Sequence, residues 1–186
     1  MELNLLSLLS KRRSIRKYKN KKVEQEKTDK IIQAALLSPS SHAIYPWQFI
    51  VVDDNHLLSR LSLSKMHGSA FLSNAPLGIV VTADKNLSDV WIEDASIAST
   101  FIMLTAHWLG LGSCWIQIRK RMHSESKTAE EHIREILKIP KNINVLSIIA
   151  LGYPNEEKMP KRKNKLLYER VFHNSFGKIL NSKFTG

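Results

Sequence analysis

Val145-Leu146-Ser147-Ile148-Ile149-Ala150-Leu151 is the clearest strand in the sequence. A run that is apolar at almost every position is typical of a strand buried on both faces of a sheet. Two other runs, at 48–52 and 77–82, have the same character. Because segments with helical spacing separate these runs, the sequence predicts an α/β or α+β sandwich. The sequence does not specify the order of the strands.

The helices are predicted from apolar spacing and from the residues that begin or end a helix. Thr28 can cap a helix that ends near Ser38, because the residue before a proline disfavours helical geometry. Gly110 and Gly112 end the longest helix. The expected helices span residues 2–9, 28–36, 54–66, 90–109 and 127–138, and residues 113–118 are expected to be extended.

The expected helix at 90–109 carries a broad apolar stripe. Ala98 and Ile102 lie at its centre, and Phe101 and Trp108 widen it. A helix that is apolar over most of its circumference is normally buried on most sides. We therefore expect this helix to pack in the core or against another subunit.

Length and composition are those of a globular protein. Of the 186 residues, 43% are hydrophobic and 24% are charged. We expect a single domain at 1–186, in which the polar, proline-bearing residues 153–186 form an extended C-terminal arm. No apolar run reaches the roughly 18 residues that span a bilayer, and the first residues lack the features of a signal peptide. The single cysteine, Cys114, forms no intrachain disulfide, so a cytoplasmic location is expected.

Charge is strongly basic and unevenly placed. The formal net charge is +11, with ten Lys or Arg residues within 11–30 and six more within 158–170. Such a balance first suggests nucleic acid as a partner. Tyr18 is the one aromatic residue in the first basic stretch, and no recognition-helix motif accompanies it. A solvated surface, or phosphate binding by a few of these residues, explains the charge better than nucleic-acid binding does.

Arg12-Arg13-Ser14-Ile15-Arg16 is the first candidate for phosphate binding. It supplies three guanidinium groups and a hydroxyl within five residues, and guanidinium groups bind phosphate through paired N–H donors. In an extended segment Arg12, Ser14 and Arg16 point to the same side, so they can converge on one phosphate. The alternative interpretation is a basic surface turn.

Residues 38–47 are a second candidate, placed between an expected helix and an expected strand. Ser40, Ser41 and His42 offer small polar side chains and backbone groups that can approach a planar polar ligand. The alternative interpretation is a capping turn followed by a core tryptophan, Trp47.

Together and in this order, the two segments resemble the FMN-dependent nitroreductase family. Further matches follow at Asn74-Ala75-Pro76, Asp94-Ala95, residues 110–116 and Leu151-Gly152-Tyr153-Pro154. The resemblance covers about residues 8–175. It implies an α+β fold of the α/β/α type, with a mixed sheet flanked by helices, in an intertwined homodimer.

The resemblance also implies a set of residues that contact FMN. The arginine-rich segment contacts the phosphate and ribityl chain, and the second segment meets the flavin from the partner subunit. Residues after Trp115 present backbone groups to the reactive edge of the flavin, and a basic residue of the arm supplies a second phosphate contact. The implied cofactor-binding residues are Arg12, Arg13, Ser14, Arg16, Pro39, Ser40, Ser41, His42, Gln117, Ile118, Lys161 and Lys163.

The implied activity is that of an oxidoreductase. NAD(P)H would pass a hydride through the flavin to a small electron-poor acceptor, such as a nitroaromatic or a quinone, in a ping-pong scheme. No catalytic side chain is expected, because the flavin carries the redox chemistry, and the seven histidines lack the spacing of a zinc site. The same fold with flavin-fragmenting or dehalogenating activity is the alternative. Ala43 and Tyr45 replace the Asn and Gln of the family pattern, so we expect this member to differ there.

Overall fold

The computed structural model describes residues 4–180, without the side chain of Lys163, and contains a four-stranded sheet. Its strands are β1 (Trp47–Val52), β2 (Leu77–Asp84), β3 (Gly112–Gln117) and β4 (Ile143–Gly152). They lie in the order β1-β2-β4-β3, and each neighbouring pair is antiparallel. The clearest strand of the sequence, β4, is therefore an interior strand with a partner on each side.

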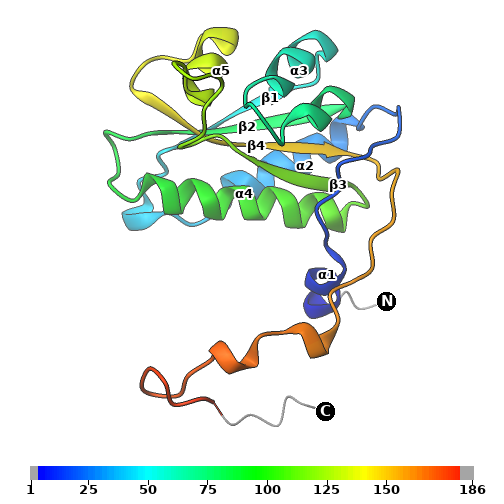
Figure 1. Ribbon diagram of the computed structural model, residues 1–186, viewed down its shortest axis with the longest axis vertical. Helices are drawn as coiled ribbons and strands as arrows, with labels where there is room; N and C mark the ends of the chain where they lie inside the picture. The colour runs from blue at the N-terminus through cyan, green and yellow to red at the C-terminus, as the bar shows by residue number, and fades with distance from the viewer. Residues whose placement is uncertain (1–3, 181–186) are drawn as a thin grey trace. The chain divides into compact units, whose positions relative to one another are not determined.

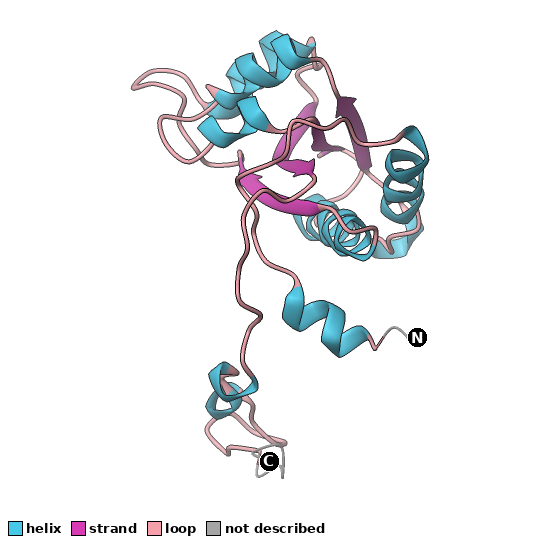
Figure 2. Cartoon of the chain, turned by 90° about the vertical axis from the view of Figure 1, so that its right-hand side faces the viewer, coloured by secondary structure: helices cyan, strands magenta, loops and turns pink. Residues whose placement is uncertain are grey.

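Helices cover both faces of the sheet (Figures 1 and 2). They are α2 (Gln25–Leu36), α3 (Asn55–Ser62), α4 (Trp91–Trp108) and α5 (Ala129–Leu137). Val80 and Ile148 are fully buried in a cluster with residues of α3 and α5. Ile79 and Ile149 are fully buried in a second cluster with residues of α2 and α4. Both faces of β2 and β4 are thus apolar, which explains why their sequences do not alternate.

This arrangement confirms the predicted α+β sandwich. An isolated parallel bridge between Ser14 and Ser113 adds a mixed element to the antiparallel sheet. The start of α2 was predicted wrongly, because the helix begins before Thr28. Thr28 is buried inside the helix, and its hydroxyl donates to the carbonyl of Glu24 instead of capping the first turn.

Helix α4 has two apolar sides. Ile102 is fully buried among residues that face the sheet. On the outer side Ile97, Phe101 and Trp108 are 38%, 36% and 52% exposed. A row of large apolar side chains in contact with solvent is typical of an interaction surface. One side of the apolar stripe of α4 packs into the core. The other side, with Ile97, Phe101 and Trp108, contacts solvent and could pack against a partner.

The chain divides into two compact units. Residues 12–158 form the larger unit, which contains the sheet and the helices that cover it. The smaller unit contains α1 (Leu5–Lys11) and, after residue 158, the 3-10 helices η3 (Lys163–Lys165) and η4 (Tyr168–Arg170). The single-domain organisation with an arm from 153 stays a prediction. Within residues 4–180, no helix has the length and apolar character needed to cross a membrane.

Candidate functional site

The arginine-rich segment runs beside β3, an edge strand of the sheet. The amide of Ile15 donates to the carbonyl of Ser113 over 2.9 Å. The ammonium group of Lys158 donates to the carbonyl of Ser14 over 3.0 Å. Because these contacts use backbone atoms of the segment, the side chain of Arg16 is not needed to hold it in place.

A glycine lets the segment approach β3 closely. The side chain of Ile15 is 7% exposed and packs against Gly112. A Cβ atom built at Gly112 would lie 2.8 Å from that side chain. Glycine within a strand commonly marks such a close approach of another chain segment. Any larger residue at this position would push the segment away from the sheet.

A carboxylate fixes the segment from its other end. Glu156 accepts the amide N–H groups of Arg16 and Lys17 over 2.5 and 3.2 Å, and pairs with Lys158 at 3.4 Å. The hydrogen bond from the Arg16 amide, helped by Lys17 and Lys158, holds the pKa of Glu156 below its usual value. Hydrogen bonds that favour the ionised form act in this direction. At neutral pH Glu156 therefore anchors the backbone between two basic residues.

Arg12, Ser14 and Arg16 all influence the thiol of Cys114 in β3. Burial raises the pKa of the Cys114 thiol, whereas the Arg16 charge, a hydrogen bond with Ser14 and the Arg12 charge lower it. The guanidinium of Arg16 lies 5.7 Å from the centre of the Phe71 ring. Within residues 4–180, neither Arg12 nor Arg16 forms an ion pair with a carboxylate. Two positive charges thus remain without a carboxylate partner in the described part of the chain.

The second candidate segment, residues 38–47, contains a strained turn. His42, Ala43 and Tyr45 have φ angles of 49°, 54° and 52°, which lie in the left-handed region that residues other than glycine seldom adopt. Each such residue costs about 1–2 kcal/mol relative to ordinary backbone. All three side chains are exposed. Contacts elsewhere must therefore hold the backbone in this shape.

Two side-chain oxygens provide those contacts. The hydroxyl of Ser40 accepts the amide of Tyr45 over 2.8 Å. The carboxylate of Asp94, in the first turn of α4, accepts the amide of Ser41 over 2.9 Å and the hydroxyl of Ser88 over 3.3 Å. Ser40 and Ser41 were predicted to contact a ligand, and the structure shows that both also stabilise the turn itself. Their contact with a cofactor stays a prediction.

The two candidate segments lie at opposite ends of the sheet within one chain (Figure 1). Trp47, which follows the turn, pairs with Ala83 in β2. Ser113, beside the arginine-rich segment, pairs with Leu151, and Leu151 pairs with Leu77 at the other end of β2. At about 3.3 Å per residue, the length of β2 separates these ends by about 20 Å. One subunit alone does not bring the two segments together.

Gln117 and Ile118 lie at the end of β3. The side chain of Gln117 accepts the indole N–H of Trp115 over 2.9 Å and donates to the carbonyl of Arg119 over 3.0 Å. The amide of Ile118 donates to the carbonyl of Leu146 over 3.1 Å, and its side chain is fully buried. The Ile118 amide already has an acceptor inside the protein. A cofactor contact by either residue stays a prediction.

Lys161 and Lys163 belong to the smaller unit. The amide of Lys161 donates to the carbonyl of Ser10 over 2.9 Å, and its side chain is exposed. Lys163 begins η3, and its side chain lies outside the described residues. A second phosphate contact by either lysine stays a prediction, as do the contacts of Arg13 and of the exposed Pro39.

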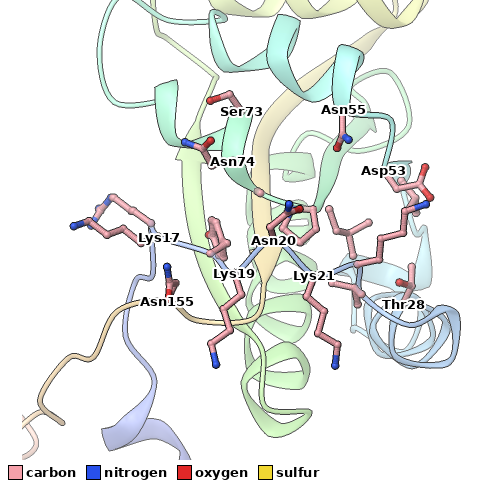
Figure 3. A pocket seen from close by; sticks show the side chains of 18 of the residues that line it. Lys17, Lys19, Asn20, Lys21, Thr28, Asp53, Asn55, Ser73, Asn74 and Asn155 are labelled. Carbon is pink, nitrogen blue, oxygen red and sulfur yellow. The ribbon is translucent and has the colours of Figure 1, made fainter.

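A polar groove of about 720 Å³ adjoins the basic stretch of the larger unit. In Figure 3 the side chain of Asn20 lies toward Asn55 and Asn74, whereas Lys19 and Lys21 point to the opposite side. Amide groups, rather than ammonium groups, occupy the middle of this groove. The groove is therefore a weaker candidate for binding a phosphate than the arginine-rich segment.

Comparisons with known proteins identify the family. The profile of the nitroreductase family matches residues 9–67 and 61–153. The chain belongs to the nitroreductase family. An FMN-dependent nitroreductase from Clostridium difficile is 53% identical, with a TM-score of 0.91 over 92% of this chain and 99% of that chain. A protein from Archaeoglobus fulgidus, provisionally named NADH dehydrogenase/NAD(P)H nitroreductase, is 41% identical over 157 residues, which are 82% of this chain and 87% of that protein.

Three residues that hold the two candidate segments were not predicted from the sequence as site residues: Gly112, Glu156 and Asp94. Each acts on a segment that is distant in the chain, because Asp94 is 53 residues from Ser41 and Glu156 is 140 residues from Arg16. The sequence pattern does not show which distant segment each of these residues contacts. For Asp94 and Gly112 the available signals were the family matches at Asp94-Ala95 and at residues 110–116.

Proposed function

We propose that this nitroreductase-family protein uses FMN to reduce a small electron-poor molecule, such as a nitroaromatic compound or a quinone, at the expense of NAD(P)H. The names of the relatives from Clostridium difficile and Archaeoglobus fulgidus support both cofactors. Bound FMN would supply the redox chemistry, accepting a hydride and passing it on in a ping-pong scheme. The residues of the chain bind the cofactor, orient it and exclude water.

The arginine-rich segment fits the phosphate of FMN. A phosphomonoester carries about −1.5 to −2 charges at neutral pH and three acceptor oxygens. Arg12 and Arg16 supply guanidinium groups that form no ion pair with a carboxylate in the described part of the chain, and Ser14 supplies a hydroxyl on the same side. Gly112 and Glu156 hold the backbone that presents them. These residues would bind the phosphate and so orient the flavin.

The observation that carries the proposal is the separation of the two family segments. Both are expected at one flavin, yet they lie at opposite ends of the sheet. A homodimer resolves this conflict if each site combines residues 12–16 of one subunit with residues 40–45 of the other. The exposed Ile97, Phe101 and Trp108 of α4 suit the apolar centre of such an interface.

Purification under native conditions tests the proposal. We expect a yellow protein with a flavin absorbance spectrum, which oxidises NADH or NADPH when a quinone or nitroaromatic is present, and which light scattering shows to be a dimer. A colourless monomer that neither binds added FMN nor oxidises NAD(P)H would refute it. Initial rates should be measured with NAD(P)H as the varied substrate at several fixed acceptor concentrations. The double-reciprocal lines should be parallel, as a ping-pong scheme requires. The cytoplasmic location stays a prediction.

A further inference from the structure

Asp94 is a buried carboxylate with an unusual set of partners. It is 2% exposed, and in residues 4–180 it forms no ion pair with a basic side chain. Its oxygens accept the amide of Ser41 and the hydroxyl of Ser88 instead. A carboxylate removed from water is costly unless hydrogen bonds compensate it. The hydrogen bonds to Ser41 and Ser88 therefore compensate the cost of burying Asp94, and we ask what they hold in place.

The amide that Asp94 holds lies at the start of the strained turn. Ser41 comes directly before His42 and Ala43, which are both left-handed. The hydroxyl of Ser40 holds the amide of Tyr45 at the far end of the same turn. The left-handed residues are thus confined between two anchored amides, while their side chains remain exposed. Backbone held in such conformations by its surroundings is frequent at functional sites.

We infer that Asp94 is a positioning residue for the proposed reaction. By holding the amide of Ser41, it keeps residues 40–45 in their left-handed shape and thereby sets the wall that these residues present to the flavin of the partner subunit. This inference rests on the proposed function, in which the turn of one subunit completes the site of the other. Asp94 itself touches neither the cofactor nor the acceptor.

Two substitutions separate the loss of these hydrogen bonds from the loss of the negative charge. Asp94→Asn keeps an oxygen that can accept the Ser41 amide, and its NH₂ group can donate to the hydroxyl oxygen of Ser88. Asp94→Ala removes both contacts. We therefore expect the asparagine variant to retain the turn and the alanine variant to release it.

Hydrogen exchange measures the turn directly and needs no flavin. In the Asp94→Ala variant, the amides of a peptide covering 38–47 should exchange about tenfold faster or more, because their protection depends on the closed turn. The Asp94→Asn variant should stay close to the wild type. Equal exchange in the alanine variant and the wild type would overturn the inference, whether or not the protein binds FMN.

A second-site rescue tests whether the turn is the reason for lost activity. Asp94→Ala should lower kcat/KM for a quinone acceptor about tenfold, since small misplacements of site groups have effects of this size. Ala43→Asn should restore part of this loss, because asparagine adopts the left-handed region more readily than alanine does. Lys138, also left-handed with φ 55° at the end of α5, provides the matched control. If Lys138→Asn restores activity equally, general stability is the cause and the inference is wrong.

Mixed dimers test whether Asp94 acts across the interface. A dimer of one Arg16→Ala subunit and one Asp94→Ala subunit would contain one site with both changes and one site with neither. We expect about half of the wild-type activity, as the symmetry of two shared sites requires. Activity at the mean of the two parent variants would show that Asp94 acts within its own subunit, which would overturn this inference. A wild-type protein without FMN would refute the proposed function alone.

Discussion

The segment at 12–16 and the turn at 40–45 differ in how the fold holds them. The segment has ordinary extended geometry, and backbone contacts, a glycine and one carboxylate hold it in place. The turn has three left-handed residues, which hydrogen bonds to Ser40 and Asp94 hold in place. An anion site needs charges that no internal partner neutralises, whereas a pocket wall needs a defined shape. The first region therefore keeps the guanidinium groups of Arg12 and Arg16 out of ion pairs within residues 4–180, and the second accepts backbone strain.

Replacing Gly112 by alanine should have the largest effect, because it lowers both stability and FMN affinity by displacing the first region from β3. The new Cβ would lie 2.8 Å from the side chain of Ile15, and overpacking of this kind costs about 1–3 kcal/mol. We expect FMN affinity to fall by about tenfold or more, because the segment moves away from β3. Fluorescence titration with FMN and thermal unfolding would measure the two effects.

Gly110 provides the control for this prediction. A Cβ there meets nothing within 4 Å, but its φ of 79° disfavours alanine. Gly110→Ala should therefore lower stability and leave FMN affinity near the wild-type value. If both variants lose FMN equally, close packing against Ile15 is not what positions the segment.

Arg16→Ala should weaken FMN binding without disturbing the fold. Hydrogen bonds to a charged group contribute about 1.5–3 kcal/mol, so we expect affinity to fall about 10- to 100-fold. Lys17 is the control, because its exposed side chain follows directly in the sequence and also forms no ion pair in the part of the chain that the structure describes. Calorimetry at one fixed salt concentration should separate the two variants. Equal losses would indicate a diffuse basic surface in place of a phosphate site.

Ser40→Ala should affect the turn and spare the arginine-rich segment. It removes the acceptor of the Tyr45 amide, and the loss of one such hydrogen bond costs about 1 kcal/mol. Urea unfolding should show a lower midpoint with an unchanged slope. Ser73→Ala, which removes an exposed hydroxyl bonded to the Ala70 carbonyl, is the control and should have a smaller effect. An equal loss in both variants would argue against strain in the turn.

Glu156→Gln should have the smallest effect, and this effect should depend on pH. The folded state lowers the pKa of Glu156 through the Arg16 amide. A carboxyl whose pKa is lowered contributes stability above its unfolded pKa of about 4.3 and loses that contribution as pH falls through the folded value. The stability difference between wild type and variant should therefore be full at neutral pH and disappear in acid. Urea unfolding across this pH range would measure it, and a constant difference would contradict the anchoring role.

The elements of the fold were largely predictable, and the reasons are local. Continuous apolar runs marked β1, β2 and β4. Both faces of β2 and β4 are buried, whereas β1, at the edge of the sheet, is only partly buried. Helix α4 was marked by its broad stripe, although only the structure separates its core side from its exposed Phe101 side. The start of α2 was missed because Thr28 has the residue type of a cap but is buried within the helix. Burial of the Thr28 side chain outweighed the preference of threonine for the first position of a helix.

The sequence by itself determined the strands, the helices, the spacing of Arg12, Ser14 and Arg16, and the family to which these motifs belong. Each of these depends on residues that are near one another in the chain. Only the tertiary structure decided that the two motif segments lie at opposite ends of the sheet, and that Gly112 and Asp94 hold them. These features depend on strand order and on contacts between distant segments, and apolar periodicity does not encode either of them.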